Sequence, residues 1–271
     1  MASGTDTAFT GSVAQFYERY MVPLIFEPYA VDLARRVTHA APKRVLELAA
    51  GTGVVTRQLA LTLDASTDLV ATDLNPAMIA EAARIGTARP VEWRQVDAMQ
   101  LPFEDASFDA VVCQFGVMFF PDRPQAYAQA RRVLRPGGQF AFNAWGPIAA
   151  NEFAEAVTQA LAALFPQDPP AFMARTPHGY NDAARIAQDL AAAGFTAAPS
   201  IQRLEFTSRA PSAHTAALAY CQGTPLRGEI EARDPHGLER ATSTAEAELV
   251  RRFGSGPIEG RIEALVVTVG R

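Results

Sequence analysis

Residues 45–60 read VLELAAGTGVVTRQLA, and this stretch decides the fold class. An apolar run that contains Glu47 turns through Gly51 and Gly53 into a helical pattern near 54–63. Glycine lets the backbone approach a ligand closely, and the first turn of a helix offers N–H groups without a partner inside the helix. The stretch therefore predicts a strand, a tight turn and a helix, with either a ligand at the turn or a purely structural role for it.

The same alternation of short apolar runs and helical patterns continues along the chain. Apolar runs lie at 44–48, 68–73, 91–96, 108–113 and 139–145, and helical patterns lie between them near 54–63, 76–85 and 123–134. Farther on, the pattern predicts helices near 150–164 and 182–193, a strand at about 199–207, a helical segment at 211–253 and a last strand at 261–269. Alternation of this kind predicts βαβ units and a parallel sheet covered on both faces.

The composition narrows the class of protein. The chain has 271 residues and a formal charge of −5, and 23 of its 24 basic residues are arginines. Because these arginines are scattered and the net charge is negative, we expect no nucleic-acid partner. Two cysteines, Cys113 and Cys221, imply no disulfide framework.

No apolar run approaches the roughly 20 residues that span a bilayer, and the first residues lack the features of a secretory signal. We expect a cytoplasmic protein with no membrane insertion, and a homodimer is left open.

The second apolar run ends in Asp73, twenty residues beyond Gly53. A carboxylate at this place in such a sheet can accept hydrogen bonds from both hydroxyls of a ribose. The alternative is that Asp73 helps to start the next helix, but Asn75 and Pro76 already supply an N-cap and a first helical residue. We therefore expect Asp73 to bind a ribose.

The turn does not spell the dinucleotide fingerprint. Thr56 stands where its third glycine would lie, and Val54 and Val55 crowd the start of the helix. A nucleoside without phosphates fits this turn better than a dinucleotide does.

With these motifs the sequence resembles the class I S-adenosylmethionine-dependent methyltransferases, and most of all the group that includes the ubiquinone/menaquinone C-methyltransferases. The family's first motif is an acidic residue followed by alternating glycines, and residues 47–53 read ELAAGTG, with Ala49 in the first glycine place. The stretches LPFEDASFD (101–109) and QFG (114–116) are also similar. The resemblance implies a Rossmann-like seven-stranded sheet with the last strand antiparallel, and S-adenosylmethionine as cofactor.

The resemblance also implies roles for individual residues. Glu47 would support the motif loop and the methionine ammonium group, Gly51 would lie against the cofactor, and Leu74 and Met78 would flank the adenine. Asp97 would accept from the adenine amino group while the Ala98 N–H donates to the ring; the alternative is an ordinary Asx turn. The full set of expected cofactor-binding residues is Tyr17, Glu47, Ala49, Gly51, Gly53, Asp73, Leu74, Met78, Asp97, Ala98, Gln114 and Phe115.

Residues at the carboxyl end of the fourth strand face the methyl group in this fold, which selects Gln114 and Phe115. Trp145, at the tip of the fifth strand, points by position into the same crevice. N-terminal helices at about 12–20 and 28–39 carry aromatic residues, of which Tyr17 and Tyr29 are expected to wall the site. The alternative is that these aromatic residues only pack in the core.

We expect one methyltransferase domain over residues 1–271. It comprises an N-terminal helical lid at 1–40, a cofactor-binding core at 41–147 and a C-terminal half at 148–271, which carries a helical insertion at about 208–255. Phe165, Phe172 and Met173 suggest an apolar lining for an acceptor pocket.

The expected activity is in-line methyl transfer to a small, partly apolar organic acceptor. No catalytic base is assigned: the four histidines are spread out, and His214 is the least poor candidate. No cluster has metal-ligand spacing, so no metal is expected. The alternatives are an S-adenosylmethionine-binding protein without transferase activity and an NAD-dependent oxidoreductase.

Overall fold

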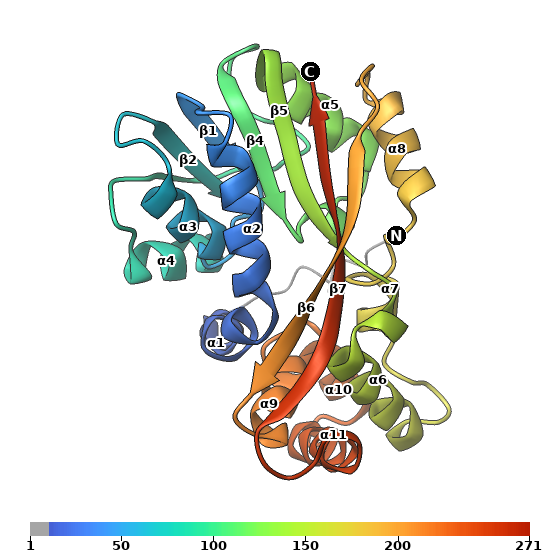
Figure 1. The fold of residues 1–271 in the computed structure, drawn as a ribbon. Helices are drawn as coiled ribbons and strands as arrows, with labels where there is room; N and C mark the ends of the chain where they lie inside the picture. The colour runs from blue at the N-terminus through green and yellow to red at the C-terminus, as the bar shows by residue number, and fades with distance from the viewer. Residues whose placement is uncertain (1–10) are drawn as a thin grey trace.

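The computed structural model describes residues 11–271, and the strands among them form one seven-stranded sheet (Figure 1). The spatial order is β3-β2-β1-β4-β5-β7-β6. The strands are β1 (Arg44–Glu47), β2 (Asp68–Asp73), β3 (Glu92–Gln95), β4 (Phe108–Gln114), β5 (Leu134–Trp145), β6 (Ser200–Ala210) and β7 (Ile258–Gly270). Neighbouring strands from β3 to β5 are parallel, and β7 runs antiparallel to both β5 and β6. The prediction of a Rossmann-like sheet with an antiparallel last strand is confirmed.

Helices cover both faces of the sheet. Helices α2 and α3 pack together in front of it in Figure 1, and α5 and α8 pack together on the other face. The elements are α1 (Gly11–Phe16), η1 (Tyr17–Phe26), α2 (Glu27–Thr38), α3 (Val54–Thr62), α4 (Pro76–Ile85), η2 (Val117–Phe119), α5 (Arg123–Val133), η3 (Ile148–Ala150), α6 (Glu152–Leu164), α7 (Phe172–Arg175), α8 (Ala183–Ala192), α9 (Ala213–Gln222), α10 (Leu226–Arg233) and α11 (Leu238–Phe253).

The N-terminal segment differs from the expected pair of separate helices. Its described part is helical without a break from Gly11 to Thr38, and η1 is a π-helix that contains Pro23. Proline has no backbone N–H to donate and its ring clashes in a regular α-helix, and wider turns accommodate such interruptions. Because the apolar residues of η1 are buried, this segment is part of the core as well as a cover for the sheet.

The last two strands run far beyond the rest of the sheet. They pair without interruption from Ser200 opposite Thr268 to Ala210 opposite Ile258. Helices α6, α7, α9, α10 and α11 gather around their far end (Figure 1), and we call these five helices the cap. The insertion predicted at about 208–255 is therefore helical, as expected.

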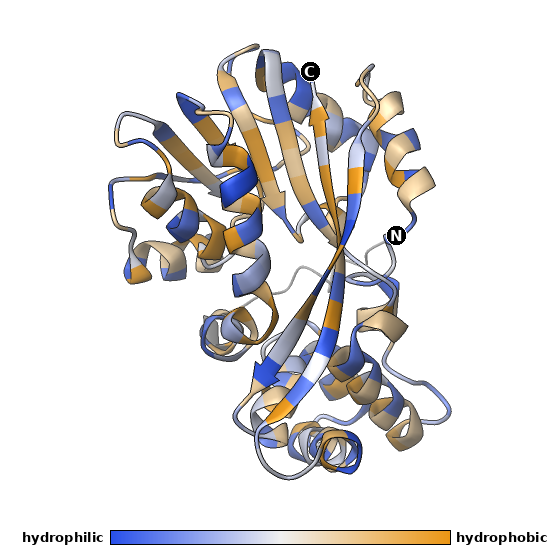
Figure 2. Ribbon diagram, viewed as in Figure 1, coloured by the Kyte–Doolittle hydropathy of each residue, from blue (hydrophilic) through white to orange (hydrophobic). Residues whose placement is uncertain are grey.

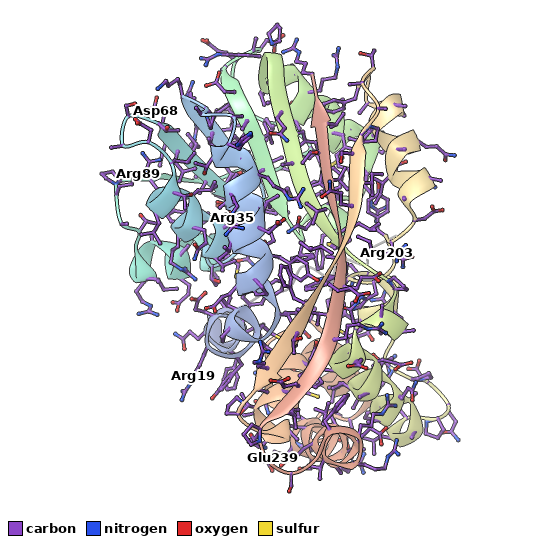
Figure 3. The ribbon with its side chains drawn as sticks, viewed as in Figure 1. Arg19, Arg35, Asp68, Arg89, Arg203 and Glu239 are labelled. Atoms are coloured by element: carbon purple, nitrogen blue, oxygen red, sulfur yellow. The ribbon has the colours of Figure 1, made fainter. Side chains whose placement is uncertain are left out.

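Hydropathy follows the burial of each strand. Strand β4 lies in the middle of the sheet and is largely hydrophobic, whereas the edge strand β6 mixes polar and apolar residues (Figure 2). The labelled charged side chains lie around the outside of the molecule, and the labelled arginines are well apart (Figure 3). None of the helices in the described part of the chain has the length and apolar character needed to cross a membrane.

Candidate active site

The loop between β1 and α3 forms the centre of the site. Backbone hydrogen bonds hold it to two neighbouring strands: Leu48 N–H donates to Val112 O at 2.8 Å, and Ala50 N–H donates to Thr72 O at 2.9 Å. Gly53 has φ +86°, and a Cβ there would lie 2.9 Å from the ring of Trp93, so only glycine fits. A Cβ on Gly51 would meet nothing nearer than the Tyr17 hydroxyl at 3.9 Å, so the outer face of this loop has room beside it.

Two buried carboxylates lie behind this loop. Glu47 is 1% exposed and accepts a hydrogen bond from the Thr56 hydroxyl at 2.6 Å, and burial raises its pKa to about 8. Asp73 accepts from Gly51 N–H and from Asn75 N–H, each at 2.8 Å, and burial also raises the pKa of this carboxyl. Within the described residues neither carboxyl group forms an ion pair, so a cationic ligand beside them would favour their ionised forms.

The residues that follow β2 adopt the predicted helix cap, but they also form a contact that the sequence does not predict. Asn75 caps α4 by accepting from Ala77 N–H, so Asp73 is not needed as a cap. The bond from Gly51 N–H to Asp73 was not anticipated; it ties the two loops together. Leu74 is 54% exposed beside them, whereas Met78 is buried.

The corner after β3 lies at the rim of the site. Asp97 is exposed and accepts a hydrogen bond from Met99 N–H at 2.8 Å, which is an Asx turn. Ala98 is half-buried. The turn thus takes the alternative geometry considered for it.

The end of β4 carries an unusual backbone conformation. Phe115 has φ +51°, a left-handed value that is costly for a residue with a large side chain. This conformation places its ring flat against Trp145, with centroids 3.7 Å apart and an interplanar angle of 5°. The neighbouring Gln114 donates to Phe26 O at 3.3 Å and accepts from Asn143, so its amide joins η1 to the sheet.

Tyr29 corrects one expectation. Its ring is fully buried and stands edge-on to both Phe115 and Trp145, and its hydroxyl donates to Leu204 O at 3.1 Å. It therefore supports the stacked pair from behind and is not in the wall of the pocket, because the face of α2 that carries it turns toward the sheet.

A cavity of about 70 Å³ lies in front of the stacked pair. Its lining comes from η1, from the ends of β4 and β5 and the short helices that follow them, from the segment 172–178, from residues 220–225 and from β7. The lining residues are Tyr17, Met21, Ile25, Phe26, Phe115, Phe119, Trp145, Asn151, Phe172, Met173, Pro177, His178, Tyr220, Thr224, Pro225 and Ile262. Tyr17, Trp145, Phe172 and Met173 thus come together as expected, and Phe165 does not line the cavity.

Comparison with known proteins gives the family. Residues 46–142 match the family described as "Methyltransferase domain", and this segment contains the loop, both carboxylates and the end of β4. Residues 46–142 form a class I S-adenosylmethionine-dependent methyltransferase domain.

Two relatives are demethylmenaquinone methyltransferases. The protein from Thermus thermophilus is 44% identical over 115 residues, which is 41% of this chain and 49% of that protein. The protein from Deinococcus radiodurans is 36% identical over 122 residues, or 44% of this chain and 50% of that protein. This chain therefore spans about half the length of these relatives.

Solved structures share the fold over most of the chain. The YcgJ protein of Bacillus subtilis has a TM-score of 0.57 at 17% identity, covering 90% of this chain and 99% of that one. Phosphoethanolamine N-methyltransferase 2 of Haemonchus contortus, solved with S-adenosyl-L-methionine, has a TM-score of 0.60 at 16% identity, covering all of this chain and 60% of that one.

The loop of the methyltransferase domain suits its cofactor. The open face of Gly51, the two buried carboxyl groups, which form no ion pair with the described residues, and the exposed Leu74 match a cationic ligand with a ribose and a flat base. The expected contacts of the individual residues stay predictions.

Sequence reasoning missed four polar residues of the pocket, which are Asn151, His178, Tyr220 and Thr224. His178 is 5% exposed and lines the cavity, and its Nδ1 lies 2.9 Å from Gly146 O at the end of β5. Because this contact joins residues 32 positions apart in the sequence, no local motif announces it. His214, the least poor candidate in the sequence, lies on the surface and pairs with Glu246 at 2.8 Å.

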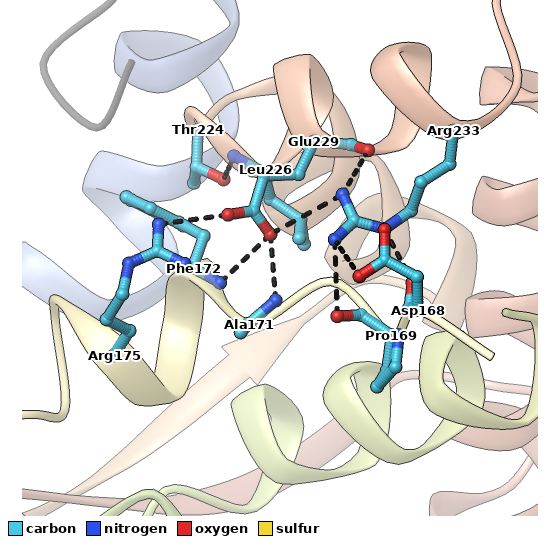
Figure 4. A network of polar contacts seen from close by, with 9 residues as sticks. All are labelled: Asp168, Pro169, Ala171, Phe172, Arg175, Thr224, Leu226, Glu229 and Arg233. Carbon is cyan, nitrogen blue, oxygen red and sulfur yellow. Dashed lines mark hydrogen bonds and ion pairs between the residues drawn. The ribbon is translucent and has the colours of Figure 1, made fainter. Parts of the chain in front are cut away.

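Within the cap, a carboxylate joins α10 to the segment around α7, beside the cavity. Figure 4 shows Glu229 of α10 accepting from Ala171 N–H at 2.8 Å, from Phe172 N–H at 3.1 Å and from the Arg175 guanidinium at 2.9 Å. Arg233, one turn along α10, bonds to Asp168 and Pro169. These bonds hold the segment that carries Phe172 and Met173 against α10, and so close one side of the cavity.

Proposed function

We propose that this chain transfers the methyl group of S-adenosylmethionine to a small, largely apolar organic acceptor that occupies the cavity. The observation that supports this most is that the proposed cofactor site and the aromatic cavity lie next to each other. The buried carboxylates and the Gly51 loop favour a cationic nucleoside, and Tyr17, which lies over Gly51, also lines an aromatic cavity.

The chemistry requires little more than alignment and dryness. When bound, S-adenosylmethionine supplies a methyl group on a positively charged sulfur, and an acceptor atom takes this methyl group by in-line displacement of the sulfur. Phe115, Trp145 and η1 exclude water from the place where the acceptor would lie. The reacting atoms are therefore held close together, and solvent does not stabilise the positive charge on the donor sulfur before transfer.

The alternatives have less support from the described contacts. Val54 and Val55 are buried at the start of α3, so the first turn of this helix is crowded by branched side chains where a dinucleotide would place its pyrophosphate. Nothing in the pocket favours a protein that only binds the cofactor.

We also propose that the partner of this chain is a small molecule and not a nucleic acid, and that the protein is located in the cytoplasm. A homodimer stays a prediction, which analytical ultracentrifugation of the full chain tests.

Incubation of the full chain with S-adenosylmethionine and a panel of apolar hydroxyl, amine and thiol compounds tests the activity. We expect release of S-adenosylhomocysteine that depends on the acceptor, measured by mass spectrometry. Binding of S-adenosylhomocysteine with no release for any acceptor would favour the binding protein, and binding of NAD instead would favour the oxidoreductase.

A further inference from the structure

Most polar groups around the cavity are used by the chain itself. The Asn151 amide donates to Pro147 O at 3.1 Å and accepts from Glu263 N–H at 3.1 Å. The Thr224 hydroxyl donates to Tyr220 O at 2.8 Å. These two side chains therefore have little left to offer a bound molecule.

His178 is different because one of its ring nitrogens remains available. A carbonyl oxygen can only accept a hydrogen bond, so the contact with Gly146 O requires the proton to be on Nδ1. Nε2 then carries a lone pair, and the contact with Gly146 O is the one hydrogen bond that the His178 ring forms with the described residues. Burial lowers the pKa of this imidazole to about 4, so the ring is neutral at neutral pH.

Tyr220 supplies a second available group in the same cavity. Its side chain is 1% exposed and lines the cavity, and burial alone, with no hydrogen bond to the described residues, perturbs its hydroxyl. Burial raises the pKa of this phenol far above neutral pH, so that it keeps its proton and can donate. The cavity thus presents one acceptor and one donor within an otherwise apolar wall.

We propose that His178 is a catalytic residue, which takes the proton from the hydroxyl group of a flat aromatic acceptor while Tyr220 orients that acceptor. The flat shape follows from the walls, where the stacked Phe115 and Trp145 rings and the Phe172 ring offer planar contacts. The hydroxyl follows from His178, because a neutral phenol is a poor nucleophile until it loses its proton, whereas an amine attacks with its own lone pair. This inference rests on the proposed function.

The step balances in atoms and charge. The hydroxyl oxygen forms a bond to the methyl carbon, the carbon–sulfur bond of the donor breaks with its electron pair on sulfur, and the hydroxyl proton passes to His178 Nε2. The positive charge of the donor is lost as the imidazolium gains one, so the net charge of the closed site does not change. Solvent takes the proton after product release.

The test compares two phenols of similar size with S-adenosylmethionine and the full chain at mildly alkaline pH. 4-Methylphenol keeps its proton there, whereas 4-nitrophenol is largely ionised. His178→Asn retains an amide N–H that can donate to Gly146 O but has no counterpart of Nε2. His214→Asn, the same change on the surface, is the control.

We expect His178→Asn to lower kcat for 4-methylphenol by about 100-fold or more, and to lower it far less for 4-nitrophenol, which has no proton to give. Calorimetry in the presence of S-adenosylhomocysteine should show about tenfold weaker binding of 4-methylphenol, because one hydrogen bond is lost. His214→Asn should match the wild type in both measurements.

Equal losses for the two phenols would show a merely structural role and overturn the proposal, as would an unchanged kcat. A wild-type chain that binds S-adenosylhomocysteine but methylates neither phenol would overturn the assigned acceptor class. A wild-type chain that does not bind S-adenosylhomocysteine would instead refute the proposed function, so the two failures are distinguishable.

Discussion

Ala49 has a left-handed backbone, with φ +51°, where the resembled family places its first glycine. The conformation explains the family's preference, because it disfavours any side chain. The alanine is tolerated here because its neighbour is small: a Cβ on Gly116 would lie 2.5 Å from the Ala49 Cβ and 2.7 Å from Cys113 Sγ. The two positions are therefore coupled across the β1 and β4 loops.

This coupling predicts the result of a double-mutant cycle. Gly116→Ala should lower the free energy of unfolding by about 2 kcal/mol through overpacking. Adding Ala49→Gly should restore part of that loss, by about 1 kcal/mol, since it removes one of the two clashing atoms. Urea unfolding of the four proteins measures both values. Strictly additive effects would show that the two residues do not press on one another.

Glu47 should make stability depend on pH. Its folded-state pKa, raised by burial to about 8, lies above the ordinary value of 4.5, so between these values the folded state holds a proton that the unfolded state has lost. Stability from this group therefore falls as pH rises through that window. Glu47→Gln should remove the fall and be the more stable protein at about pH 8 by a few kcal/mol, with little difference at about pH 4.5.

Urea unfolding of both proteins at the two pH values tests this. In the variant, the Thr56 hydroxyl can still donate to the amide oxygen of the glutamine. A variant that is less stable than the wild type at the higher pH would mean that Glu47 is ionised and well paired in the folded protein.

At the scale of elements, the cap depends on one carboxylate that gathers several donors. The Glu229 side chain is 15% exposed and joins α10 to the segment that carries Phe172. Glu229→Ala should lower the free energy of unfolding by about 2 kcal/mol, because two N–H groups and the Arg175 guanidinium lose their acceptor. Limited proteolysis should then cut the segment 165–180 sooner than in the wild type.

Glu231→Ala is the matched control on the same helix. Its partner Arg227 lies one turn away and the pair is partly exposed, so the change should stay within about 0.5 kcal/mol. Similar behaviour of the two variants would remove the special role of Glu229.

The elements that could be predicted from the sequence are those with local signals. Gly53, Asp73 and the Asn75 cap lie at strand ends whose apolar runs are clear in the sequence, and each lies beside the β1 loop as expected. Periodicity does not show which neighbour a helix face meets, and Tyr29 consequently lies behind the pocket. The π-helix around Pro23 was equally hidden, because its register is set by packing against the sheet and the cap.

At the scale of the whole molecule, the long β6–β7 pair connects the main part of the sheet to the cap. Its first part completes the sheet, and its far part carries the cap (Figure 1). The cavity lies where the sheet, the cap and η1 meet, which is why its residues come from the whole length of the chain. Motifs predict only the half of the site that belongs to the sheet. Phe172 and Met173 could be expected from their place in a long apolar segment, whereas His178 and Tyr220 meet the site through the tertiary fold alone.

The most direct test of this account is a calorimetric titration of S-adenosylhomocysteine into the wild-type chain and into Asp73→Asn. We expect one molecule of S-adenosylhomocysteine to bind per chain. The variant, folded by circular dichroism, should bind about 30-fold more weakly, because charge-assisted hydrogen bonds to the ribose are lost. No heat of binding with the folded wild type, or equal affinity for both proteins, would contradict it.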